Sequence, residues 1–214
     1  MTNSSDLASG VGSRICHDII SPLGAIGNGL ELLSMGAAAD GPEVDLIAQS
    51  VTSASARLRA YRVAFGLSQH VTDLARDEVH EILHDLYAGG RFSFVWHGKR
   101  NLARSDAKSA FLGLLCLETA LPRGGQLELD TREAVTLRGT GALAAREAAC
   151  WDVLSGGGPA IIEKDDADHT DPGDGDAATF EPSRIHFPML AEHLKITGRP
   201  PREAWAPDQL MLTL

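Results

Sequence analysis

The 214-residue sequence has no long apolar run and no segment that resembles a targeting signal. A membrane-spanning helix needs roughly 18 to 20 consecutive apolar residues, and no stretch of this chain approaches that length. The first residues, M-T-N-S-S-D, lack the basic and apolar regions of a signal peptide. We therefore expect a cytoplasmic protein that has no membrane partner.

Basic charge and paired cysteines are also scarce. The chain has 19 lysines and arginines against 29 acidic residues, which gives a formal net charge of −10 at pH 7. Because nucleic acids and anionic membranes bind basic surfaces, this balance excludes both and favours proteins or small cations as partners. The three cysteines, Cys16, Cys116 and Cys150, are far apart and lack C-x-x-C spacing, so they indicate neither a disulfide framework nor a zinc site.

Hydrophobic residues nevertheless make up 43% of the chain, which is enough for a sizeable core. The length allows one large domain or two small ones. Near residue 71 the hydrophobic periodicity changes from a purely helical pattern to a mixture of helices and strands. We therefore expect an α+β protein with a helical domain at residues 1–70 and a second domain at residues 71–214.

The most strongly patterned stretch is residues 7–35, inside a helix that we expect to begin near Asp6 and end at Gly36. At about 100° per residue, one side of this helix is apolar. That side carries Val11, Ile15, Ile19, Pro22, Leu23, Ile26, Leu30 and Leu33. The opposite side carries Arg14, His17, Ser21, Gly24 and Asn28. The pattern predicts a helix that packs through its apolar side and presents His17 to the outside.

A second helix is predicted over residues 43–68. Its apolar positions recur at spacings of four and three, as Ile47, Val51, Ala54, Leu58, Tyr61 and Phe65. Two antiparallel helices cannot enclose both of their apolar faces, but two such hairpins can do so as a four-helix bundle. We therefore expect a homodimer through residues 7–68. The alternative is that residues 1–68 pack on the C-terminal domain of their own chain.

The sequence R-I-C-H-D-I-I-S-P-L at residues 14–23 resembles the phospho-acceptor box of histidine kinases. In that box a histidine, an acidic residue, a polar residue four positions after the histidine and a Pro-Leu pair lie on the first helix of a dimerising hairpin. The longer string through residue 33, which continues G-A-I-G-N-G-L-E-L-L, is more similar to the alphaproteobacterial histidine phosphotransferases of the ChpT type. The resemblance implies that His17 accepts a phosphoryl group.

Elementary chemistry gives each residue of this box a role. An imidazole with an ordinary pKa of about 6.5 is mostly neutral at pH 7, so a ring nitrogen of His17 can attack phosphorus. Asp18 can hold the other ring N–H. Pro22 costs its helix roughly 3 kcal/mol or more, which a kink or a freed carbonyl beside His17 would justify. Arg14, Ser21, Gly24 and Asn28 would form the face on which a partner docks. The alternative is a surface helix with an incidental histidine.

Residues 71–214 are predicted to form an α/β sandwich. Helices are expected at 77–88, 108–121, 141–154 and 186–196, and strands at 91–97, 126–131, 134–139 and 210–214. Residues 155–183 are rich in aspartate and glycine and should form a mobile acidic loop. Its aspartates do not match the spacing of a calcium loop, so we propose no metal site there.

In order and position, residues 71–214 resemble the ATP-binding domain of histidine kinases. That domain holds Mg²⁺ with an asparagine-rich helix and reads adenine with a D-x-G-x-G turn. Here residues 111–121, F-L-G-L-L-C-L-E-T-A-L, contain no asparagine, and the turn is R-G-T-G-A with Arg138 in place of the aspartate. The resemblance therefore implies a degenerate kinase-like domain that binds neither ATP nor another cofactor.

A phospho-acceptor without an ATP site must exchange its phosphoryl group with other proteins. We expect a relay through His17 between receiver-domain aspartates, with Mg²⁺ supplied by the partner receiver. By resemblance, the donor is the receiver of a hybrid cell-cycle kinase of the CckA type, and the acceptors are response regulators of the CtrA and CpdR type. Two alternatives stay open: an ATP-dependent histidine kinase with an unorthodox nucleotide site, and a non-catalytic scaffold of a two-component pathway.

Overall fold

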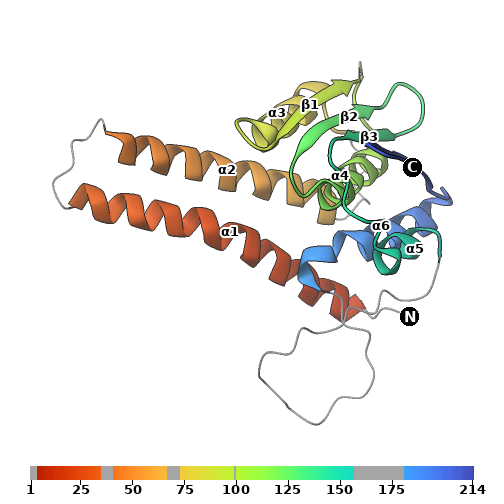
Figure 1. Ribbon diagram of the computed structural model, residues 1–214, viewed down its shortest axis with the longest axis horizontal. Helices are drawn as coiled ribbons and strands as arrows, with labels where there is room; N and C mark the ends of the chain where they lie inside the picture. Colours follow the sequence, from red (N-terminus) through yellow and green to blue (C-terminus); the bar gives the residue numbers. More distant parts are fainter. Residues whose placement is uncertain (1–3, 35–40, 67–72, 99, 157–180) are drawn as a thin grey trace, which may run out of the picture.

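The computed structural model describes residues 4–34, 41–66, 73–98, 100–156 and 181–214. Two long helices, α1 (Ser4–Ser34) and α2 (Pro42–Phe65), lie side by side and run in opposite directions (Figure 1). Both were predicted, with ends within three residues of those expected. Helix α2 begins at a proline, which suits the first helical position because that residue needs no backbone N–H bond. Helix α1 continues through Pro22 without a break.

The rest of the chain is built on a five-stranded sheet with the strand order β1-β2-β3-β5-β4. The strands are β1 (Phe92–His97), β2 (Gly125–Asp130), β3 (Thr136–Thr140), β4 (Arg202–Ala206) and β5 (Gln209–Thr213). Only β1 and β2 pair in parallel, and the other three pairs are antiparallel. The mixed α+β fold with a mainly antiparallel sheet is therefore confirmed. The dimeric bundle stays a prediction.

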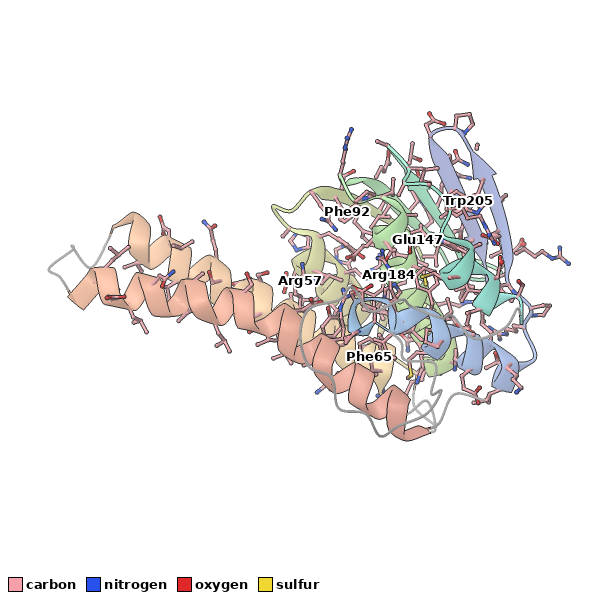
Figure 2. The ribbon with its side chains drawn as sticks, turned by 60° about the horizontal axis from the view of Figure 1, so that its bottom comes forward. Arg57, Phe65, Phe92, Glu147, Arg184 and Trp205 are labelled. Carbon is pink, nitrogen blue, oxygen red and sulfur yellow. The ribbon has the colours of Figure 1, made fainter. Side chains whose placement is uncertain are left out.

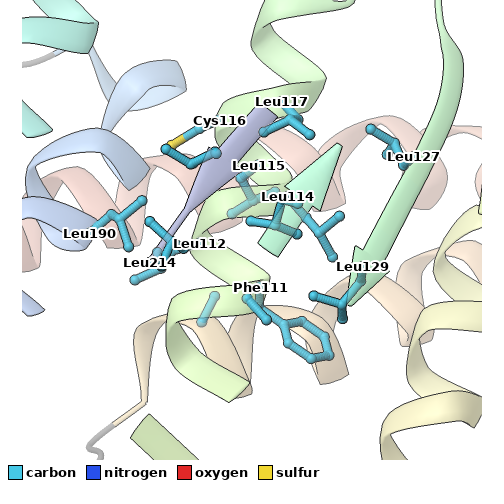
Figure 3. Packing of buried hydrophobic residues seen from close by; sticks show 14 of the residues in the cluster. Phe111, Leu112, Leu114, Leu115, Cys116, Leu117, Leu127, Leu129, Leu190 and Leu214 are labelled. Carbon is cyan, nitrogen blue, oxygen red and sulfur yellow. The ribbon is translucent and has the colours of Figure 1, made fainter. Parts of the chain in front are cut away.

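Helix α4 (Arg104–Ala120) lies at the centre of the core. One side packs against the sheet, and other sides contact α2 and α6 (His186–Thr197). Figure 3 shows leucines of α4 beside Leu127 and Leu129 of β2 and Leu190 of α6. The same core includes residues from the last turns of α2, namely Ala60, Tyr61 and Ala64. The C-terminal end of α2 is therefore anchored in the C-terminal part of the chain.

The remaining helices cover the flanks of this core. Helix α3 (Arg76–Tyr87) packs against α2 and β1, while α5 (Ala148–Leu154) packs against α6. A short 3-10 helix, η1 (Pro182–Arg184), contacts α1. No helix within the described ranges has both the length and the apolar character to cross a membrane.

Two predictions about this region were wrong. Residues 141–147 are not helical, because the backbone N–H groups of Gly141 and Ala144 donate to the carbonyls of Asp208 and Ala120, which lie far away in sequence. The strand β4 was not predicted, and it forms a hairpin with β5 at the edge of the sheet. Helix α4 also begins one turn earlier than expected. Most of the predicted acidic loop, residues 157–180, lies outside the described residues.

A buried histidine links α6 to α4. His186 is 1% exposed, its Nε2 lies 3.1 Å from the hydroxyl of Thr119, and its Nδ1 has no hydrogen-bond partner among the described residues. Burial lowers the pKa of His186 well below 6.5, and the nearby charges of Arg14 and Arg184 lower it further. Burial also lowers the pKa of His193, which lies on the same helix. Both rings are therefore uncharged in the folded protein near neutral pH.

This burial predicts that the protein becomes less stable as the pH falls below about 6.5. There the unfolded chain binds protons that the folded protein excludes, so the free energy of unfolding should fall by up to about 1.4 kcal/mol per pH unit for each such histidine. Urea unfolding between pH 7.5 and 5.0 measures this slope. His186→Gln should make it shallower, whereas His97→Gln, on an exposed side chain, should not. Equal slopes for wild type and His186→Gln would contradict the assignment.

Candidate functional site

The predicted phospho-acceptor lies in the middle of α1. The backbone of residue 17 is part of the unbroken helix, so positions 14, 18 and 21 lie within about one turn of it. The side chains of Cys16 and His17 lie outside the described part of the structure. The role of His17 as nucleophile therefore stays a prediction, which its neighbours on the helix can support.

The neighbouring carboxylate, Asp18, is held by two other side chains. The Nε of Arg14 lies 2.8 Å from Asp18 Oδ2, and the hydroxyl of Tyr61 on α2 donates a hydrogen bond to the same oxygen. Arg14 also donates from Nη1 to the backbone carbonyl of Ser183 in η1. The side chains of Arg14 and Asp18 are only 15% and 11% exposed. This small network joins α1 to α2 and to the C-terminal part of the chain.

The prediction that Arg14 lies on the exposed side of the helix with His17 was therefore wrong. Arg14 and Asp18 are four residues apart, so their side chains share one face of α1, and that face is covered by α2 and η1. Ser21, Gly24 and Asn28 are exposed, as the helical pattern predicted. A Cβ atom added to Gly24 would meet no atom within 4 Å. Space beside this glycine is therefore open in the single chain.

The predicted apolar face of α1 is only partly covered within one chain. Leu23 and Leu30 are 57% and 56% exposed, and on α2 Val51 and Leu58 are 47% and 48% exposed. Each pair is seven residues apart, which places its two members on one face of a helix. Packing of α1 on α2 therefore leaves an apolar stripe on both helices. Packing of residues 1–68 on their own C-terminal domain, the alternative considered above, does not bury these four residues.

A cleft of about 790 Å³ opens beside this network, between the two long helices and α3, α4 and the start of β1. Its lining includes Asp18 and Ser21, together with three arginines from three parts of the chain: Arg14, Arg57 and Arg91. Figure 2 labels Arg57 on α2, where that helix meets the rest of the molecule, and Phe92 at the start of β1. The cleft therefore gathers positive charge in a chain that is acidic overall.

One further carboxyl group, that of Glu118 on α4, lines the cleft. The hydroxyl of Tyr87 donates to its Oε1 at 2.8 Å. Burial raises the pKa of Glu118, although the hydrogen bond from Tyr87 and the charges of Arg57, Arg14 and Arg91 oppose that shift. Burial also raises the pKa of Tyr87 well above 10, so its hydroxyl stays a donor. Sequence reasoning missed this group, although a lone glutamate inside an apolar helical run was a usable signal.

The turn that replaces the adenine-reading motif has a structural role. Arg138 on β3 pairs with Glu128 on β2, with Nη1 lying 3.2 Å from Oε2 on the exposed face of the sheet. A Cβ atom at Gly139 would come within 2.8 Å of the side chain of Leu121, and Gly141 has a φ of +152°, which favours glycine. These two glycines therefore allow β3 and the following turn to approach α4 closely.

The helix that stands, by resemblance, in the position of the magnesium-holding helix of kinases is α4, and it is buried in the core. Every residue of α4 from Ala107 to Leu117 is buried, and no asparagine lies in it. Among the described residues, no group of three or more histidine, cysteine or acidic side chains lies close enough to hold a metal ion.

Comparison with known proteins gives three results. Residues 76–165 match the family model of the histidine phosphotransferase C-terminal domain. The protein phosphotransferase ChpT of Brucella abortus (strain 2308) is 37% identical over 143 residues, which are 63% of this chain and 68% of that protein. A solved bacterial phosphotransferase superposes with a TM-score of 0.78 at 25% identity, covering 100% of this chain and 97% of the other.

The assignment to a family rests on the sequence match, because that match spans more than two thirds of the Brucella protein at well over 30% identity. The structural match adds that the same arrangement of elements extends over the whole of both chains. The chain therefore belongs to the ChpT family of histidine phosphotransferases.

Proposed function

We propose that this protein relays a phosphoryl group through His17, from the phospho-aspartate of one receiver domain to the aspartate of another, and that it does not use ATP as a donor. One observation carries the proposal. The H-D-x-x-S-P-L box lies on a continuous stretch of α1, in a chain that belongs to a phosphotransferase family. The family gives the type of reaction, and the box supplies a nucleophile for it.

The transfer needs little from this chain beyond a nucleophile and its alignment. A ring nitrogen of His17 attacks phosphorus in line, an N–P bond forms, and the bond to the donor carboxylate breaks. Transfer to the second receiver reverses these bond changes. The Mg²⁺ and lysine of each receiver neutralise the charge of a loose transition state, so Mg²⁺ is expected on the partner.

Asp18 is proposed to orient His17 and to offset imidazolium charge. Its contacts with Arg14 and Tyr61 support this role, because both donors limit the movement of the carboxylate. Arg14 is proposed to act through Asp18 and not as a free docking residue, because its side chain donates to Asp18 and to the carbonyl of Ser183 in η1.

Receiver docking is proposed along the exposed face that carries Ser21, Gly24 and Asn28. The open space beside Gly24 supports this surface, since no described residue lies close enough to require a glycine there. By family resemblance, the donor would be the receiver of a CckA-type hybrid kinase, and the acceptors would be CtrA-type and CpdR-type regulators. The proposal places the protein in a cell-cycle pathway of the cytoplasm.

A homodimer is proposed through α1 and α2. The exposed apolar stripe formed by Leu23, Leu30, Val51 and Leu58 supports it, because each large aliphatic side chain gains roughly 1.5 to 3 kcal/mol when it is fully buried. Two copies can bury these stripes against each other as a four-helix bundle.

The relay predicts separate effects for three substitutions in α1. His17→Gln should abolish phosphoryl acceptance from a phosphorylated receiver domain, because no other exposed group in the box can form a phosphoramidate. Asp18→Asn should slow transfer by about 10²- to 10⁴-fold while binding persists. Gly24→Leu should weaken receiver binding and leave transfer within any bound complex nearly unchanged. Rapid-quench transfer assays with labelled receiver, together with binding titrations, measure all three. If the His17→Gln protein still forms phosphohistidine, another residue is the nucleophile. If the variant preserves signalling between the purified components, the protein is a scaffold.

The dimer predicts that Val51→Asp yields a monomer at micromolar concentration, since the interface would bury an unpaired charge. Sedimentation equilibrium measures the mass. Ile196→Asp is the matched control, because Ile196 is an apolar residue that is 74% exposed on α6, outside the two long helices, and this variant should stay dimeric. A monomeric wild type would rule out the bundle.

The ATP-independent reading predicts that the purified protein incorporates no label from ATP carrying a labelled γ-phosphate, with or without Mg²⁺. The same preparation must accept phosphate from a phosphorylated receiver domain, which shows that His17 is competent. Label on His17 from ATP in the absence of any kinase would instead favour the unorthodox histidine kinase considered from the sequence.

A further inference from the structure

The cleft between the two long helices and the start of β1 contains positive charge that no part of the relay explains. Three arginines line it, from α1, α2 and the residue before β1, against two carboxyl groups, those of Asp18 and Glu118. All three guanidinium groups are close enough to Glu118 to influence its pKa. They therefore converge on one region of the cleft, although they come from distant parts of the sequence.

Two of the three arginines form no direct ion pair within the described part of the chain. Arg14 is paired with Asp18 at 2.8 Å. Arg57 and Arg91 make no hydrogen bond or ion pair with any described residue; Arg91 only stacks on the ring of Phe92, with its Cζ 5.0 Å from the centroid. Arg57 is half-buried, and a guanidinium group removed from water without an anion is unfavourable. The cleft therefore holds two guanidinium groups that no described side chain pairs with directly.

The second carboxyl group in the cleft does not pair directly with these two arginines. Glu118 is half-buried, and its Oε1 accepts a hydrogen bond from Tyr87. No hydrogen bond or ion pair joins Glu118 to Arg57 or Arg91 in the described part of the chain, so both guanidinium groups keep their N–H donors available. Exposed polar groups of Ser21, Gln49 and Ser53 line the same cleft and can donate further hydrogen bonds.

We propose that this cleft binds a small phosphate-bearing anion, with the phosphate group held by the guanidinium groups of Arg57 and Arg91. Arginine suits this ligand because its planar fork of N–H groups matches two oxygens of a phosphate. The volume of about 790 Å³ lies within the range of small-molecule sites, so the cleft has room for more than the phosphate group itself. The ligand is either inorganic phosphate or the phosphate group of a small metabolite.

This site is distinct from the nucleotide site that a kinase-like domain would use. The turn at residues 138–142, which stands where the adenine-reading motif would be, contributes no residue to the lining of the cleft. The overall charge of −10 opposes anions at long range, but that field is screened within about 10 Å at 0.1 M salt, whereas the arginines act at contact distance. The inference also does not depend on phosphoryl transfer through His17.

The test is titration of the full-length protein with inorganic phosphate, and separately with glycerol 2-phosphate, at a constant ionic strength set with NaCl. Calorimetry and the melting temperature should both show saturable binding, because a ligand that binds only the folded state stabilises it. Arg91→Gln and Arg57→Gln should each weaken binding by about tenfold or more. Tighter binding of the ester identifies a phosphorylated metabolite as the ligand, and tighter binding of inorganic phosphate identifies the free ion.

Arg202→Gln is the matched control. Arg202 is an exposed arginine on β4, at the opposite edge of the sheet from β1, and it makes no ion pair with any described residue. This variant should bind as the wild type does. Equal weakening by Arg202→Gln and Arg91→Gln, or no saturable binding of either compound, would overturn the proposal. If Arg57→Gln unfolds, the exposed Arg91 still decides the question.

Discussion

The burial of α4 is the constraint on which the rest of the structure depends. Every residue from Ala107 to Leu117 is buried, so the sheet, α2 and α6 must supply apolar surface around it (Figure 3). The buried Lys108 donates from Nζ to the carbonyl of Gly66, at 2.8 Å, and burial lowers the pKa of Lys108. Because a helix C-terminus carries partial negative charge, this bond fastens the end of α2 to the central helix.

Most helices and strands could be predicted from the sequence, because their apolar residues repeat with the period of the element that buries them. The failures occurred where distant partners decide the structure. Residues 141–147 have glycine and alanine in a helix-compatible pattern, yet their N–H groups bond to Asp208 and Ala120. In strand β4, mainly Glu203 and Trp205 face inward. Two such positions are too few to identify a strand from the sequence before its pairing with β5 is known.

The candidate site also combines local features, which could be predicted from the sequence, with contacts between distant residues, which could not. Sequence reasoning located the box on α1, because the helical period and a short motif are local properties. It placed Arg14 on the wrong side, since the groups that hold this residue, Tyr61 and Ser183, are 47 and 169 positions away. It missed the cleft for the same reason: Arg57, Arg91 and Glu118 meet only when α2, α4 and the start of β1 are brought together.

The shared core has a consequence for how partners are recognised. Ala60, Tyr61 and Ala64 of α2 are buried with α4, so a swing of the C-terminal part about the end of α2 would expose apolar surface. The long helices and the sheet are thus held in one arrangement before any partner arrives. A protein that touches both parts at once meets a preorganised surface and loses less conformational entropy on binding than it would against two independently moving parts.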